Sequence, residues 1–247
     1  MRTDERLRPP LPRRTLVEEI FVVLSLSLLA SAVYAVISLL ERPLSGVAVA
    51  SVSQSAQLAR QVVGIAFGLA PVWLVTYLAR RSGEGLAGIG LAWDRPREDL
   101  LRGFALFVVV AIGGIGVYLG AVELGVNRFV VPVPPLGHWW TVPVLVLTAA
   151  QAALLEEVVA VAYLVTRLRQ IGLTEVAAIG TSGLLRASYH LYQGWGGFLG
   201  NLAMGVLFGV VFVRTRRAWP IVIAHLLLDV GAGVGFLLFR EHLPGFS

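Results

Sequence analysis

The chain has 247 residues, of which 57% are hydrophobic and 14% are charged, and its mean hydropathy is +0.79. Soluble domains carry about 25% charged residues, so this composition excludes an ordinary soluble enzyme and indicates a protein with several membrane spans. Cysteine is absent, which excludes disulfides, thiolate metal sites and a cysteine nucleophile. The net charge of +5 comes from twenty arginines and no lysine. These arginines lie in short clusters between apolar runs, so they indicate membrane topology and not nucleic-acid binding.

Residues 1–15 are predicted to form a basic cytoplasmic tail, and residues 16–247 a single transmembrane domain. The expected fold is all-α, a polytopic bundle of about seven transmembrane helices. Six or eight helices are possible, because the ends of apolar runs are poorly defined. The seven runs are residues 20–40, 61–78, 104–122, 140–165, 176–192, 198–213 and 219–239.

The arginines predict the orientation of this bundle. With the N-terminus in the cytoplasm, fifteen arginines fall in inner segments, four fall in outer segments, and Arg186 remains within a span. This distribution satisfies the positive-inside rule. The inner segment of residues 79–102 is expected to lie on the membrane surface, anchored by Trp93. An arginine-rich chain without lysine is typical of a GC-rich bacterium, so the expected location is a bacterial cell membrane.

Two adjacent carboxylates, Glu156 and Glu157, interrupt the apolar run of residues 140–165. An ionised carboxylate in hydrocarbon costs at least roughly 2.5–3.5 kcal/mol, so both need partners. Neighbouring side chains on an α-helix point about 100° apart, so these two are not expected to face one point. One is expected to face a cavity as a general base, and the other to be held by a cation or by hydrogen-bond donors. A buried ion pair that only locks helices together is the structural alternative.

Arg186 and His190 are four residues apart, which places them on one face of the fifth predicted helix. An arginine at this depth needs an acidic partner, and Glu156 and Glu157 are the nearest candidates. A hydrogen-bonded core histidine is the structural alternative for His190.

His225 and Asp229 repeat this spacing in the last predicted helix. Side chains one turn apart can orient each other, so the carboxylate is expected to fix the tautomer of the imidazole. A buried pair that serves helix packing is the structural alternative.

These three stretches could bind a metal such as zinc, with Glu156, His190 and His225 as candidate ligands. They could equally position and activate a water without a metal. The sequence has no His-Glu-x-x-His, so the usual helical signature of zinc proteases is missing. It also has no Gly-x-Ser-x-Gly, so serine catalysis is disfavoured, and no phosphate-binding glycine loop.

At these residues the chain resembles the CPBP family of intramembrane proteases, which includes the CAAX prenyl endopeptidases and the bacterial Abi proteins. The family pattern is Glu-Glu-x-x-x-Arg, then Phe-x-x-x-His, then His-x-x-x-Asn or Asp. The resemblance covers roughly residues 148–231. The matching positions are Glu156, Glu157, His190, His225 and Asp229.

Two positions depart from the pattern. The arginine of the first motif falls on Val161, and the phenylalanine of the second falls on Arg186. We hypothesise that Arg186 supplies, from the fifth helix, the charge that Val161 no longer supplies from the fourth.

The resemblance implies that Glu156 is the general base and works with His190 on the attacking water, and that His225 and Asp229 stabilise the oxyanion. That assignment needs all of them at one depth. Counting at about 1.5 Å per residue from the inner arginines gives roughly 12 Å for His225, 16 Å for Glu156 and 25 Å for His190. Helix tilt or a shifted fifth helix would have to absorb the difference.

The expected function is therefore intramembrane hydrolysis of a peptide bond in a membrane-associated protein or peptide, with the catalytic core at about residues 140–240. The expected partners are this substrate and the lipid bilayer, without nucleic acid, and the cofactor is either a divalent metal or none. Two alternatives remain open: a non-catalytic family member that acts as a scaffold or bacteriocin-immunity protein, and a small proton-linked transporter.

Overall fold

The computed structural model describes residues 11–29, 31–32, 54–125 and 137–239. Every regular element within these residues is a helix. In chain order they are α1 (Arg13–Leu26), α3 (Gln54–Gly68), α4 (Ala70–Arg81), α5 (Gly85–Gly88), α6 (Pro96–Glu123), α7 (Thr141–Leu154), η1 (Leu155–Tyr163), α8 (Leu164–Gln170), α9 (Glu175–Tyr189), η2 (Leu191–Gln193), α10 (Trp195–Thr215) and α11 (Trp219–Phe239). Of the predicted tail, only residues 11–15 are described, and α1 begins within them.

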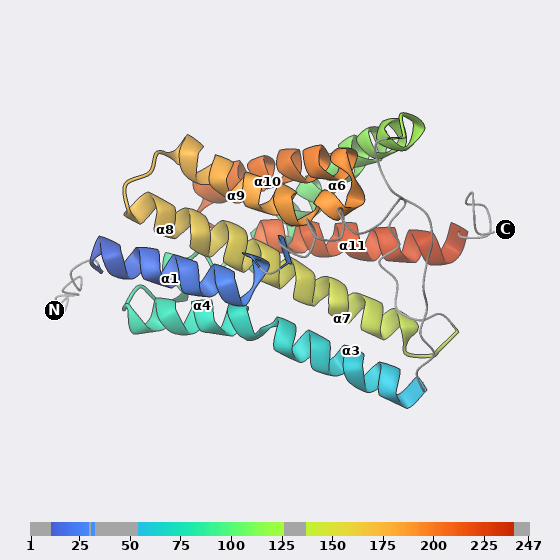
Figure 1. Ribbon diagram of the computed structural model, residues 1–247, viewed down its shortest axis with the longest axis horizontal. Helices are drawn as coiled ribbons and strands as arrows, with labels where there is room; N and C mark the ends of the chain where they lie inside the picture. Colours follow the sequence, from blue (N-terminus) through green and yellow to red (C-terminus); the bar gives the residue numbers. More distant parts are fainter. Residues whose placement is uncertain (1–10, 30, 33–53, 126–136, 240–247) are drawn as a thin grey trace.

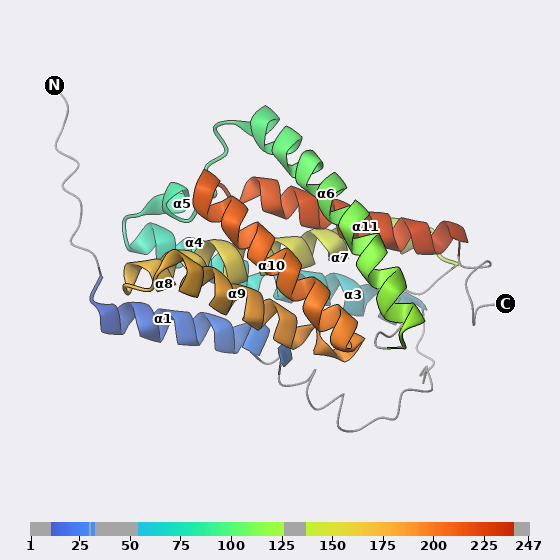
Figure 2. The ribbon, with the colours of Figure 1, turned by 90° about the horizontal axis from the view of Figure 1, so that it is seen from above.

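The predicted class, a polytopic helical bundle, is confirmed. Five stretches of the described chain are long and apolar enough to cross a membrane. Most of the helices run along the long axis of the molecule (Figure 1), while α6 and α10 cross them obliquely (Figure 2). The first predicted span lies partly outside the described residues. The five stretches are 61–81, 96–116, 141–170, 195–215 and 219–238.

The fifth predicted span, residues 176–192, forms the 15-residue helix α9. At 1.5 Å per residue this helix is about 22 Å long. That is shorter than the hydrocarbon core of about 30 Å, so α9 does not cross it alone. Thr174 caps its N-terminus by accepting a hydrogen bond from the backbone N–H of Ala177, and the helix ends before His190.

The continuous helix α7–η1–α8 is the centre of the bundle (Figure 1). Its residues 157–168 are all buried, because α1, α4, α9, α10 and α11 pack around this stretch. A helix that is apolar on all sides is stable only when neighbours cover it completely.

The middle of this central helix, η1, has the wider π-helical turn, in which hydrogen bonds run from residue i to residue i+5. Such segments are rare in proteins, and many of those that occur lie at functional sites. The hydroxyl of Ser182 on α9 donates to the backbone carbonyl of Ala160, 2.6 Å away, which ties α9 to the π-helical stretch.

Glycines let α9 and α10 approach closely. Gly205 and Gly209 are four residues apart on α10, the small-residue spacing common at helix contacts in membranes. A Cβ at Gly205 would lie 3.0 Å from the Cα of Gly183 and 3.2 Å from the Cδ of Arg186. Gly205 therefore sets both the distance between the two helices and the space for Arg186.

We expect Gly205→Ala to destabilise the protein by about 1–3 kcal/mol, because the methyl group overpacks this contact. Gly116→Ala is the matched control, since a Cβ there meets nothing within 4 Å. The control is expected to be neutral or to gain up to about 1 kcal/mol from helix propensity. Thermal unfolding in detergent measures both, and equal shifts for the two variants would contradict the packing argument.

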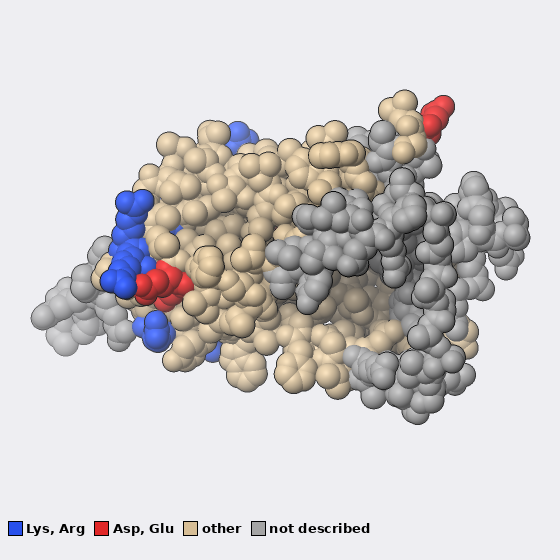
Figure 3. All heavy atoms as spheres, viewed as in Figure 1, with Lys and Arg blue, Asp and Glu red and all other residues tan. Residues whose placement is uncertain are grey.

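Charged side chains gather at one end of the bundle, where α1 begins and α4 and α8 end (Figure 3). We call this the arginine-rich end. Arg167 is fully buried there and donates to the carboxylate of Glu84, 2.7 Å away, while Glu19 of α1 lies 3.8 Å from its Nε. This pairing joins α1 and the turn after α4 to the central helix.

The segment that was expected to lie on the membrane surface packs against the turn between α10 and α11. Arg217 donates two hydrogen bonds to Asp99, at 2.6 and 2.7 Å, and the backbone N–H of Ala218 donates to the carbonyl of Gly90. The ring of Trp93 packs edge-on against that of Trp219, with centroids 4.7 Å apart. The segment is therefore anchored by protein contacts, and contact of Trp93 with lipid stays a prediction.

Candidate active site

Arg186 lies at the centre of a buried polar cluster formed by η1, α9 and α11. Its Nη1 donates to Glu157 Oε1 at 2.5 Å, and its Nη2 lies 3.3 Å from Glu156 Oε2. The guanidinium also lies 5.6 Å from the centroid of the Phe208 ring. The side chain is 1% exposed. The prediction that Arg186 has an acidic partner is confirmed, and it has two.

The expectation that Glu156 and Glu157 cannot face one point is wrong, because both contact the same guanidinium. The reason is the π-helical turn of η1. A turn that holds more residues than an α-helical turn rotates successive side chains by less than 100°, so neighbours converge. The planar fork of Arg186 then receives one carboxylate on each of its terminal nitrogens.

The two glutamates nevertheless have different surroundings. Glu157 is fully buried, and its Oε1 lies 2.7 Å from Nδ1 of His225 in addition to its bond with Arg186. The carboxylate of Glu156 is 13% exposed, and its Oε2 accepts a hydrogen bond from the hydroxyl of Tyr189 at 2.8 Å. Glu157 therefore links three helices, whereas Glu156 lies at the accessible edge of the cluster.

His225 lies between two carboxylates. Its Nδ1 faces Glu157, and its Nε2 lies 3.5 Å from Oδ2 of Asp229, one turn further along α11. The imidazole is almost completely buried, while Asp229 is 40% exposed. The spacing of four residues brings Asp229 beside His225 as expected, but the contact is long for a hydrogen bond, so the orientation of the imidazole by Asp229 stays a prediction.

His190 lies at the end of α9, where its Nδ1 is 3.1 Å from the backbone carbonyl oxygen of Arg186. A carbonyl oxygen only accepts, so Nδ1 carries the proton, and Nε2 of the neutral ring keeps its lone pair. The ring packs between those of Tyr189 and Tyr192, at centroid distances of 4.8 and 6.2 Å. No hydrogen bond joins His190 to Glu156 in the described structure, so the predicted partners are neighbours and not a bonded pair.

Counting residues from the inner arginines placed the candidate groups at different depths in the membrane, but in the structure they lie together. His225 contacts Glu157 directly, and Glu156, Arg186 and Tyr189 are joined to the same cluster. Counting at a fixed rise assumes straight parallel helices. Here α9 is short and begins beyond a turn, and neighbouring helices cross at an angle (Figure 2).

Residues 138–231 match the family model described as type II CAAX prenyl endopeptidase Rce1-like. This segment is Rce1-like. It begins just before α7, ends within α11 and contains every residue of the polar cluster, so the resemblance to the CPBP family is confirmed. No curated protein and no solved structure matches the chain.

One group within the Rce1-like segment has the spacing of a metal site. Oxygen or nitrogen atoms of Glu156, Glu157 and His225 lie within 4.8 Å of one another. This set differs from the predicted ligands, because Glu157 takes the place of His190. The guanidinium of Arg186 already bonds Glu157 and lies 3.3 Å from both Glu156 and His225. A second cation would meet this fixed positive charge, so the residues do not fit a metal.

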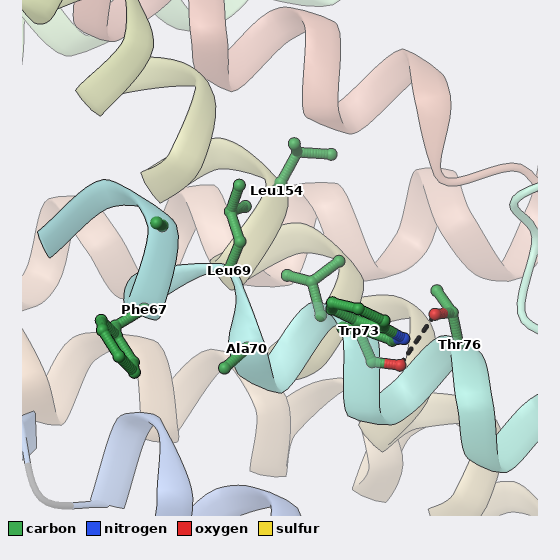
Figure 4. A pocket seen from close by; sticks show the side chains of 8 residues that line it. Phe67, Leu69, Ala70, Trp73, Thr76 and Leu154 are labelled. Atoms are coloured by element: carbon green, nitrogen blue, oxygen red, sulfur yellow. Dashed lines mark hydrogen bonds between the residues drawn. The ribbon is translucent and has the colours of Figure 1, made fainter. Parts of the chain in front are cut away.

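An apolar groove lies outside the Rce1-like site, where α3 and α4 meet (Figure 4). Leu154 lines one side of it and is the last residue before η1. No residue of the polar cluster lines the groove, so we do not assign it to the chemistry. Its other lining residues are Ala66, Phe67, Leu69, Ala70, Val72, Trp73 and Thr76.

Sequence reasoning missed Tyr189, which bonds Glu156, and Ser182, which bonds the backbone of η1. Both are hydrogen-bonding residues of α9. Tyr189 directly precedes His190, so a search for every polar side chain beside a motif residue would have found it.

Proposed function

We propose that this protein is an intramembrane endopeptidase of the bacterial cell membrane, with its N-terminus in the cytoplasm. Its substrate is a membrane-associated protein or peptide. One observation carries the proposal: within the Rce1-like segment, the accessible carboxylate of Glu156 adjoins the buried network of Glu157, Arg186 and His225. Ionised side chains inside an apolar bundle cost free energy of insertion, so this network is expected to serve a function beyond packing.

Glu156 is the general base. Its contacts with Tyr189 and Arg186 both fall on Oε2, which leaves Oε1 to bind a water. Oε1 takes a proton from this water while the water oxygen forms a bond to the carbonyl carbon of the scissile peptide. The electron pair of the carbonyl moves onto its oxygen, and a tetrahedral oxyanion results. The lone pair on Nε2 of His190 accepts a hydrogen bond from the other O–H of the water, and this bond orients the water for attack.

His225 stabilises the oxyanion. Nδ1 of the imidazole is engaged by Glu157, with Arg186 3.3 Å away, so Nε2, whose contact with Asp229 is long at 3.5 Å, is the ring nitrogen that can donate to the oxyanion. Asp229 is itself an anion and donates no hydrogen bond, so it acts through the imidazole. The intermediate then collapses, the C–N bond breaks, and the leaving nitrogen takes the proton held by Glu156.

Arg186 has a positioning role. It pairs with two carboxylates and fixes the position of the backbone carbonyl that orients His190. The charge of this guanidinium replaces that of a metal, so no step of the mechanism passes through a metal ion.

The test is cleavage of a membrane-tethered peptide library by the purified full-length protein in detergent, with and without a chelator. We expect cleavage that the chelator does not change. Glu156→Gln is the inactive comparison, and Glu175→Gln is the matched control, because Glu175 is an exposed carboxylate paired with Arg169 away from the cluster. Loss of cleavage on chelation, restored by zinc, would refute the metal-free site.

A non-catalytic scaffold or immunity protein is the second candidate. Its support is that Arg186 pairs with both glutamates, so each buried acid has a partner within the protein without any substrate. A proton-linked transporter makes a separate prediction: a flux in proteoliposomes that depends on a proton gradient and is lost in Glu156→Gln. Absence of both cleavage and flux in a well-folded protein would favour the scaffold.

A further inference from the structure

Tyr189 connects the reactive carboxylate to the end of α9. Its hydroxyl donates to Glu156 Oε2 at 2.8 Å, and its ring lies 4.8 Å from that of His190. The side chain is 6% exposed, so packing holds the ring in place. A rigid donor of this kind restricts the rotation of the carboxylate it bonds.

We propose that Tyr189 is a positioning residue, whose hydroxyl holds Glu156 so that Oε1 faces the attacking water. The catalytic consequence rests on the proposed endopeptidase function, whereas the bond to Glu156 does not. Tyr189 occupies an unspecified position of the second motif, between Arg186 and His190, so the resemblance does not assign it a role.

The charged groups around Glu156 show why the neutral hydroxyl of Tyr189 is important for the position of its carboxylate. Glu157 neighbours it on η1, Arg186 contacts it from α9, His190 of α9 interacts with it electrostatically, and His225 faces the cluster from α11. Arg186 is shared with Glu157, which lies closer, at 2.5 Å against 3.3 Å. Of the two contacts with Oε2 of Glu156, the one from the hydroxyl of Tyr189 is shorter, at 2.8 Å, than the one from Arg186, at 3.3 Å.

Tyr189→Phe removes this hydroxyl and keeps the ring. A hydrogen bond to a charged group is worth about 1.5–3 kcal/mol, which corresponds to a loss of kcat of about ten- to hundredfold. We expect KM to change by less than about threefold, because the hydroxyl contacts Glu156 and not the substrate. Loss of a donor also favours the protonated carboxyl, so the acid limb of the pH–rate profile should move to higher pH.

A second measurement needs no cleavage. Dicyclohexylcarbodiimide reacts with protonated carboxyl groups within membranes, and peptide mass spectrometry locates the adduct. We expect half-maximal labelling of Glu156 at higher pH in Tyr189→Phe than in the wild-type protein. Tyr77→Phe is the control, because Tyr77 is an exposed tyrosine of α4 and its variant should label as the wild type does. Thermal unfolding confirms that each variant is folded.

The two measurements separate this inference from the proposed function. A shifted labelling profile without cleavage by any variant would support the hold of Tyr189 on Glu156 and leave the endopeptidase without support from this library. Cleavage by the wild type with identical labelling and pH–rate profiles in Tyr189→Phe would overturn the inference and leave the endopeptidase in place. If Tyr189→Phe lowers activity without moving either profile, the role is structural and the inference fails.

Discussion

Glu156→Gln is expected to lower kcat for peptide cleavage by about 10²–10⁴-fold, the usual contribution of a general base. The amide keeps the size of the side chain and can still accept the hydrogen bond from Tyr189, but it cannot take a proton from water. Because Glu157 retains its bonds to Arg186 and His225, the buried network survives the substitution.

The measurement is single-turnover cleavage of the best peptide from the library, together with thermal unfolding in the same detergent. The unfolding temperature of Glu156→Gln should stay close to that of the wild type. Glu175→Gln should match the wild type in both cleavage rate and unfolding temperature. Equal cleavage by wild type and Glu156→Gln would show that another group activates the water.

Arg186→Ala is expected to destabilise the protein by about 3–5 kcal/mol, the cost of breaking a buried ion pair by removing one partner. Glu157 would keep His225 as its partner but lose the cation that bonds it at 2.5 Å. Its Oε2 is already buried without a hydrogen-bond partner, so its second oxygen offers no compensation.

Thermal unfolding and the yield of monodisperse protein measure this loss. Arg169→Ala is the control, because that arginine is 40% exposed and its pair with Glu175 is worth about 0–1 kcal/mol. Adding Glu157→Gln to Arg186→Ala should recover part of the loss, since the stranded charge is then gone. A near-normal unfolding temperature for Arg186→Ala alone would refute the argument.

Thermal unfolding also tests the idea that Arg186 replaces the arginine that the family has at the position of Val161. Val161 is buried in the central helix, at the position where the family has its arginine. If Arg186 has taken over that charge, then Val161→Arg combined with Arg186→Phe restores the family arrangement. This double variant should be more stable than Arg186→Phe alone.

Much of the bundle could be predicted from the sequence, because apolar runs and arginine clusters report directly on burial and on membrane topology. The pairing of Arg186 with a glutamate was predictable for a related reason, as a charge at that depth has few possible partners. The length of α9 was not predicted. Nothing in the residues directly after Tyr189 marks a helix end, and the glycine that ends the helical path before α10 is Gly194, whose φ is 100°.

The π-helical turn of η1 was not predictable either. The difference between i→i+4 and i→i+5 hydrogen bonding lies in the backbone, and a run such as Val158 to Ala162 is apolar in both forms. The convergence of Glu156 and Glu157 follows from that turn. Tyr189 was missed because its partner lies 33 residues away in the sequence, so only the packing of α9 on η1 brings the two together.

The pairing of Arg186 with two glutamates also bears on how the chain enters the bilayer. On translocon scales each such charge at a helix centre opposes insertion by about 2.5–3.5 kcal/mol, so α7–η1 and α9 are each penalised when they insert alone. When the two helices insert together as a hairpin, Arg186 pairs with the carboxylates of η1 before either helix meets lipid. We therefore expect α7–η1 and α9 to leave the translocon as one unit, so that assembly of this part of the site becomes a step of biogenesis.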